Sequence, residues 1–120
     1  MKDKILVIDD NHEFLKSIKD FLIYERFEVM AAQDGEKGLL IARQKKPDLI
    51  LCDVNMKQKD GFKVLKELQQ HDTTSSIPLV FISMYTEVSK MTKGTRMGDK
   101  GYLVKPFNRK ELIEMITRSL

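Results

Sequence analysis

Short, almost purely apolar runs recur along the chain, and each is stopped by a polar residue. This pattern constrains the fold more than any other feature of the sequence. Apolar runs of four residues bounded in this way are typical of strands buried on both faces of a sheet. The runs are Ile5–Ile8, Leu49–Cys52, Leu79–Ile82 and the more mixed Gly101–Val104. We predict a further strand at Phe27–Ala31, where the sequence is Phe-Glu-Val-Met-Ala.

Amphipathic stretches separate the runs and predict five helices. From Asn11 onward, apolar residues return at helical spacing through Leu22. Asp34 is the expected N-cap of the second helix. This helix should run to about Lys45, because Pro47 cannot continue it. The expected helices cover 11–22, 34–45, 62–68, 86–97 and 108–120, the last with Asn108 and Glu111 as an approximate capping box. Five strands alternating with five helices predict an α/β fold, a parallel sheet with helices on both faces.

Composition excludes several classes of protein. A chain of 120 residues, 42% of them hydrophobic, fits one domain spanning residues 1–120. The single cysteine, Cys52, excludes an internal disulfide framework and a multi-cysteine zinc site. No apolar run approaches the roughly 20 residues of a membrane span, and the N-terminus does not resemble a signal peptide, so we expect a cytoplasmic protein without a membrane partner. A net charge of +3 is too small to indicate direct nucleic-acid binding.

Polar side chains follow four of the expected strands, at the edge where such folds bind ligands. They are Asp9, Asp10, Asp53, Ser83 and Lys105. Clustered carboxylates repel one another unless a cation joins them, and hard oxygen ligands suit Mg²⁺. A carboxylate can also attack phosphorus to form an aspartyl phosphate. The ammonium of Lys105 and the hydroxyl of Ser83 would then contact the phosphoryl oxygens.

With these residues in view, the sequence resembles the receiver domains of two-component response regulators. The motif residues are Asp9–Asp10, Asp53 followed by Asn55–Met56 and Asp60–Gly61, Ser83, and Gly101–Phe107. The match covers nearly the whole chain in order and spacing. The resemblance implies a CheY-like, flavodoxin-like doubly wound fold and a phosphorylation-controlled signalling switch. It implies a phosphoacceptor that assists its own phosphorylation and dephosphorylation, and not a turnover enzyme.

The resemblance implies a chemical role for each acidic residue. Asp53 would accept a phosphoryl group from a histidine kinase or a phosphotransfer protein. Asp10, Asp53 and the backbone carbonyl of Asn55 would bind Mg²⁺, the implied cofactor, and Asp9 would assist through a water molecule.

The resemblance also implies the parts of a switch. Lys105 would pair with Asp53 and then with the phosphoryl group, Ser83 would move toward the new phosphate, and Tyr102 would swing inward. This movement would reshape the face formed by the fourth helix, fifth strand and fifth helix. That face would control a downstream protein or output domain, or a homodimer formed on phosphorylation.

The sequence departs from the family pattern next to the expected site. Lys57 stands where proline is usual, and Met84 stands where a small residue is usual. Met84 would narrow access to Asp53, and the bulky Tyr85 would shield the acyl phosphate from water, which together predict a slow reaction with the donor and a long-lived phosphoryl form. Lys57 and Lys59 either attract a phosphodonor or are solvated loop residues.

Other functions give different expectations. A Mg²⁺-dependent phosphohydrolase with an aspartate nucleophile needs a second acid two residues later, where this chain has Asn55. A flavin-binding module needs a phosphate-binding loop after the first strand, where this chain has Asp9–Asp10. A receiver-like domain that signals without phosphorylation is a third alternative. Met1 lies close to the first predicted strand, which argues against an upstream domain. The sequence does not decide whether an output domain follows Leu120.

Overall fold

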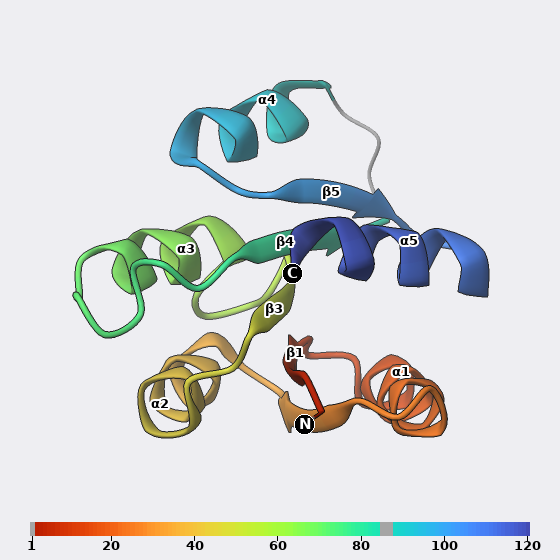
Figure 1. Ribbon diagram of the computed structural model, residues 1–120. Helices are drawn as coiled ribbons and strands as arrows, with labels where there is room; N and C mark the ends of the chain where they lie inside the picture. The colour runs from red at the N-terminus through yellow and green to blue at the C-terminus, as the bar shows by residue number, and fades with distance from the viewer. Residues whose placement is uncertain (1, 85–87) are drawn as a thin grey trace.

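A computed structural model describes residues 2–84 and 88–120, with the side chains of 88–91 outside the description. Five parallel strands form one sheet in the order β2-β1-β3-β4-β5 (Figure 1). The strands are β1 Lys4–Ile8, β2 Glu28–Ala32, β3 Leu49–Asp53, β4 Leu79–Ser83 and β5 Gly101–Val104. The predicted doubly wound parallel sheet is confirmed. The second strand begins one residue later than predicted, at Glu28, and ends one residue later, at Ala32.

Five helices cover the two faces of this sheet. They are α1 His12–Tyr24, α2 Gly35–Lys45, α3 Gly61–Gln69, α4 Val88–Met97 and α5 Arg109–Ser119. α1 and α5 lie on one face, and α2, α3 and α4 lie on the other (Figure 1). Each face has its own buried core, because successive side chains of a strand point to opposite sides. None of the helices in the described part of the chain is both long and apolar enough to cross a membrane.

Side-chain caps fix where four of the helices begin. Asn11, Asp34, Asp60 and Asn108 each accept a hydrogen bond from the backbone N–H three residues later. Such caps satisfy donors that the first turn of a helix leaves unpaired. The predicted cap at Asp34 and the predicted Asn108–Glu111 capping box are confirmed. The expected start of the fourth helix, at residue 86, lies outside the described residues.

The loop after β3 returns tightly to the end of its own strand. The N–H of Gly61 donates to the carbonyl of Val54 at 2.9 Å. A Cβ at residue 61 would lie 2.5 Å from the carbonyl oxygen of Asp53, so only glycine permits this approach. The third helix therefore starts at Gly61, one residue earlier than its apolar face predicts, and the loop stays beside Asp53.

Candidate functional site

The carboxyl ends of β1 and β3 bring three aspartates together. Asp9 directly follows β1, and its N–H donates to the carbonyl of Ala32 at 3.1 Å, which extends the strand pairing to the site. Asp53 is the last residue of β3. One carboxylate oxygen from each of Asp9, Asp10 and Asp53 lies within 4.8 Å of the others. The acidic cluster predicted from the strand ends is therefore present.

Lys105 is held mainly by Asp9. Its Nζ donates to Asp9 Oδ2 at 2.7 Å, whereas Asp53 Oδ1 is 4.0 Å away. The second oxygen of Asp9 accepts the N–H of Asn11 at 2.9 Å. Asp9 is only 1% exposed, and a buried carboxylate needs such partners. The pairing of Lys105 with Asp53 that the family resemblance implied is thus the longer of its two contacts in this state.

Asp53 carries negative charge that its surroundings compensate only in part. Its pKa is raised to about 7, first by burial and then by the nearby carboxylate of Asp9. Lys105 acts in the opposite direction, and the more exposed Asp10 adds to the rise. A cation with oxygen ligands would relieve this repulsion. The donor set therefore fits Mg²⁺, with Asp10 and Asp53 offering direct ligands and Asp9 already engaged by Lys105.

The two expected switch residues lie on the neighbouring strands β4 and β5. Ser83 ends β4, is fully buried, and its carbonyl accepts the N–H of Lys105 at 2.7 Å. Tyr102 on β5 pairs in register with Phe81 and is partly buried against the core on the face that α2, α3 and α4 cover. Asn55 is exposed in the loop that follows Asp53. The carboxyl edge of the sheet thus brings together Asp9, Asp10, Asp53, Ser83 and Lys105, whereas Tyr102 lies two residues before the end of β5.

An aromatic side chain beside Lys105 was not identified from the sequence. The Lys105 ammonium lies 3.8 Å from the centre of the Phe14 ring, and Phe107 contacts that ring edge to face. An ammonium over an aromatic face is attracted by the ring electrons. The helical spacing of Phe14 indicated a core position, and nothing in the sequence paired it with a lysine far along the chain.

The residues expected to control access give a mixed result. Met84 is 71% exposed and lines a groove between α1 and α5 together with Lys105, so it does not cover Asp53 in this state. Tyr85 lies outside the described residues. Lys57 is exposed, in keeping with either reading of that residue.

Lys59 differs from both readings given to it. Its Nζ pairs with Glu36 of α2 at 2.6 Å and with Glu67 of α3, and its side chain is only 18% exposed. The hydrogen bonds that Lys59 donates to these carboxylates, that to Glu36 first, raise the pKa of Lys59. The residue joins two helices and is neither a solvated loop lysine nor a free charge for a donor. Sequence distance hid this role, because one of its partners is 23 residues away.

Comparisons with known proteins agree with this geometry. Residues 5–117 match the family described as response regulator receiver domain. A probable transcriptional regulator, ycf27, from Porphyridium aerugineum is 35% identical over 92% of this chain and 45% of its own length. Protein PilH from Pseudomonas aeruginosa is 30% identical, over 98% of this chain and 97% of its own length. The structure of chemotaxis protein CheY4 from Vibrio cholerae superimposes with a TM-score of 0.95 at 30% identity, over the whole of both chains. The chain spans about half the length of the first curated relatives it matches.

Proposed function

The chain belongs to the response regulator receiver family of two-component signalling, and from this premise we propose that Asp53 is its phosphoacceptor. The supporting observation is the acidic cluster with Lys105 at the carboxyl edge of the sheet. Asp53 is the central strand-end carboxylate of that cluster and has the shifted pKa. Shifted pKa values of this kind gather at functional sites.

The proposed reaction transfers a phosphoryl group from a histidine of a kinase or phosphotransfer protein. A carboxylate oxygen of Asp53 attacks phosphorus, the P–N bond to the donor imidazole breaks, and the released nitrogen takes a proton from solvent. Lys105 favours the ionised, nucleophilic form of Asp53 and then meets the charge of the new phosphoryl oxygens. A bound Mg²⁺, held by Asp10, Asp53 and the carbonyl of Asn55 with Asp9 assisting through water, would neutralise charge on those oxygens.

The proposed output is a change in surface and not a turnover reaction. A phosphoryl group on Asp53 adds charge beside Ser83 and Tyr102, which lie on β4 and β5. We expect both side chains to move toward the site and to reshape the face formed by α4, β5 and α5. That face would bind a downstream protein, an output domain or a second copy of the chain. Because several curated relatives are about twice as long as this chain, an attached output domain belongs to the proposal.

The test is the mass of the intact protein after incubation with acetyl phosphate and Mg²⁺. We expect one added phosphoryl group on the wild type, none on Asp53→Asn, and none when EDTA removes the metal. The matched control is Asp72→Asn, an exposed acid in the loop after α3, which should be labelled like the wild type. Labelling of Asp53→Asn at the wild-type level would overturn the proposal. Failure of the wild type to bind either phosphoryl group or beryllofluoride would leave a receiver that signals without phosphate.

The lifetime of the phosphoryl group is a separate prediction. Met84 and Tyr85 follow Ser83 directly, and we expect their bulk to slow the entry of water to the acyl phosphate once the switch has moved. The double variant Met84→Ala/Tyr85→Ala should lose phosphate faster than the wild type, measured by intact mass after the donor is removed. Unchanged decay would contradict this role.

A further inference from the structure

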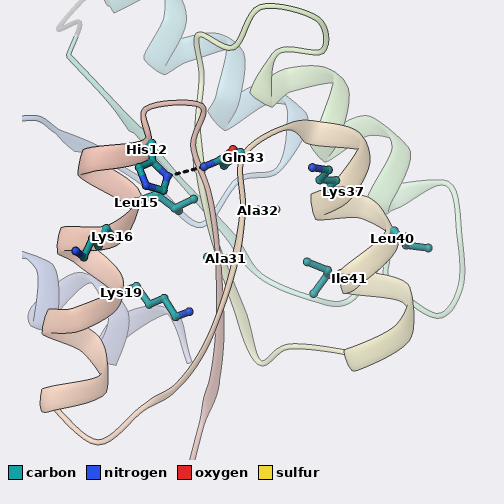
Figure 2. Close-up of a pocket in the computed structure, with 10 residues that line it drawn as sticks. All are labelled: His12, Leu15, Lys16, Lys19, Ala31, Ala32, Gln33, Lys37, Leu40 and Ile41. Carbon is teal, nitrogen blue, oxygen red and sulfur yellow. Dashed lines mark hydrogen bonds between the residues drawn. The ribbon is translucent and has the colours of Figure 1, made fainter.

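The free edge of the sheet at β2 carries an open groove that the acidic cluster does not use (Figure 2). Its volume is about 510 Å³, and its walls come from α1 and α2. Ala31 and Ala32 of β2 form the floor, and their small side chains leave the edge hollow. At the end of β2, Gln33 Nε2 contacts His12 Nδ1 at 2.6 Å and closes the groove beside the start of α1 (Figure 2).

The backbone of β2 offers unpaired groups to this groove. Glu28 donates its N–H to Asp3 at 3.0 Å, and the carbonyl of Ala32 accepts from Asp9 at 3.1 Å, so these residues bond toward β1. Alternate residues of a strand direct their backbone groups to the same side, so Val29 and Ala31 direct theirs to the free edge. Within the described residues, β2 pairs in the sheet with β1 alone. An edge of this kind is a template for another strand.

The rim of the groove is basic on both sides. Lys19 reaches from α1 toward the strand, and Lys37 reaches toward it from α2 (Figure 2). Both lysines are exposed, and among the residues that the structure describes, none that lines the groove is acidic. Ile41 of α2 and Leu15 of α1 add apolar surface between them. The groove therefore combines free main-chain groups, apolar walls and positive charge.

We propose that this groove binds an acidic segment of a partner protein, which adds as a strand to the free edge of β2. Side chains of an added strand point alternately toward α1 and α2, so acidic residues on its two faces would meet Lys19 and Lys37. Main-chain hydrogen bonds would supply affinity, and charge would select the partner. A second copy of this chain suits the groove poorly, because pairing β2 with β2 would bring the basic rims together.

The first experiment uses the capped hexapeptide Glu-Glu-Val-Val-Glu-Glu and its counterpart with four lysines. Each face of this peptide in the extended state carries two acidic residues around one valine. In a ¹⁵N NMR titration at low salt, we expect the acidic peptide to shift the amides of β2 and to slow hydrogen exchange at Ala31. The lysine peptide should do neither. Binding should persist in Asp53→Asn, which separates this proposal from the phosphoacceptor role.

Charge-reversal variants supply the matched comparison. Lys19→Glu/Lys37→Glu should weaken binding about tenfold. The control Lys63→Glu/Lys66→Glu makes the same charge change on α3, outside the groove, and should bind like the wild type. Lys37 and Lys63 occupy the same position after an aspartate N-cap, so the substitutions at these two positions perturb the helix starts similarly.

Backbone pairing is tested separately with Ala31→Pro, which removes the outward N–H without touching the bonds to β1. This variant should lose peptide binding. If it does not fold, exchange at the Ala31 amide of the wild type decides the matter alone. Equal binding of the two peptides, an Ala31 amide that stays unprotected at saturation, or a dimer formed through β2 would each overturn the proposal.

Discussion

Two aspartates in the described part of the chain have pKa values that are raised first of all by burial, and only one of them belongs to the site. Asp53 sits among other carboxylates that a cation can neutralise. Asp99, between α4 and β5, has its pKa raised to about 6 by burial. Its Oδ2 is buried and has no hydrogen-bond partner within the described residues. An unsatisfied buried oxygen of this kind lowers stability.

Asp99→Ala should therefore stabilise the protein at pH 8. Because the folded-state pKa of about 6 exceeds the ordinary value of 3.8, the folded chain binds the proton more tightly. The contribution of Asp99 to stability falls as pH rises from about 4 to about 6. We expect a gain of about 1 kcal/mol at pH 8, kept small by the partial exposure of the residue, and a smaller gain at pH 4. Urea unfolding at both values measures it, with exposed Asp72→Ala as control. Equal gains at both pH values would contradict the argument.

Phe14 gives a second prediction at the scale of single residues. Its ring lies against the Lys105 ammonium, and this attraction is worth about 0.5–1 kcal/mol. Phe14→Leu should slow phosphorylation by acetyl phosphate about two- to fivefold, while Phe14→Tyr, which keeps the ring, should not. Phe21→Leu is the control. Phe21 lines the groove between α1 and α5 as Phe14 does, but its ring contacts Arg109 and not Lys105. Equal slowing in Phe14→Leu and Phe21→Leu would assign the effect to packing.

Among the elements, α4 shows why a glycine sits inside a helix. A glycine inside a helix, such as Gly94, costs about 1 kcal/mol relative to alanine. In the structure, a Cβ at this position would lie 2.2 Å from Asp99 Oδ2 and 3.1 Å from the ring of Phe81. The helix thus packs closely on the turn that follows it, and the N–H of Asp99 donates to the Gly94 carbonyl at 3.0 Å.

A double-mutant cycle tests this close packing. Gly94→Ala should destabilise the wild type by about 1–3 kcal/mol, because the clash outweighs the gain in helix propensity. In the Asp99→Ala background the loss should shrink by at least about 0.5 kcal/mol, since the closest atom is then absent. Thermal or urea unfolding of the four proteins gives the coupling. Additive effects would show that Asp99 does not determine the choice of glycine.

The helices and strands were predictable because their signals are local. Apolar runs bounded by polar residues located β1, β3 and β4, and capping residues such as Asp34 and Asn108 located helix starts. The start of α3 was missed by one residue, because the requirement for Gly61 comes from the carbonyl of Asp53, eight residues earlier. Boundaries set by contacts between elements leave no local signal.

Across the whole molecule, topology made the position of the candidate site predictable. Parallel strands align their carboxyl ends, so residues that follow different strands had to meet. The contacts among those residues were less predictable. Strand ends do not determine that Lys105 pairs more closely with Asp9 than with Asp53, or that Lys59 joins α2 to α3. Such pairings depend on side-chain geometry that forms only when distant elements pack.

The central claim is that Asp53, among all the acidic residues of this chain, carries the phosphoryl group. Borohydride reduction of the phosphorylated protein converts an acyl phosphate to an alcohol, which peptide mass spectrometry can locate. We predict reduction, to homoserine, at residue 53 in the wild type, with Asp9 and Asp10 unmodified. Reduction at Asp9 or Asp10 in the wild type, or no reduced aspartate in protein that carries a phosphoryl group, would contradict the account.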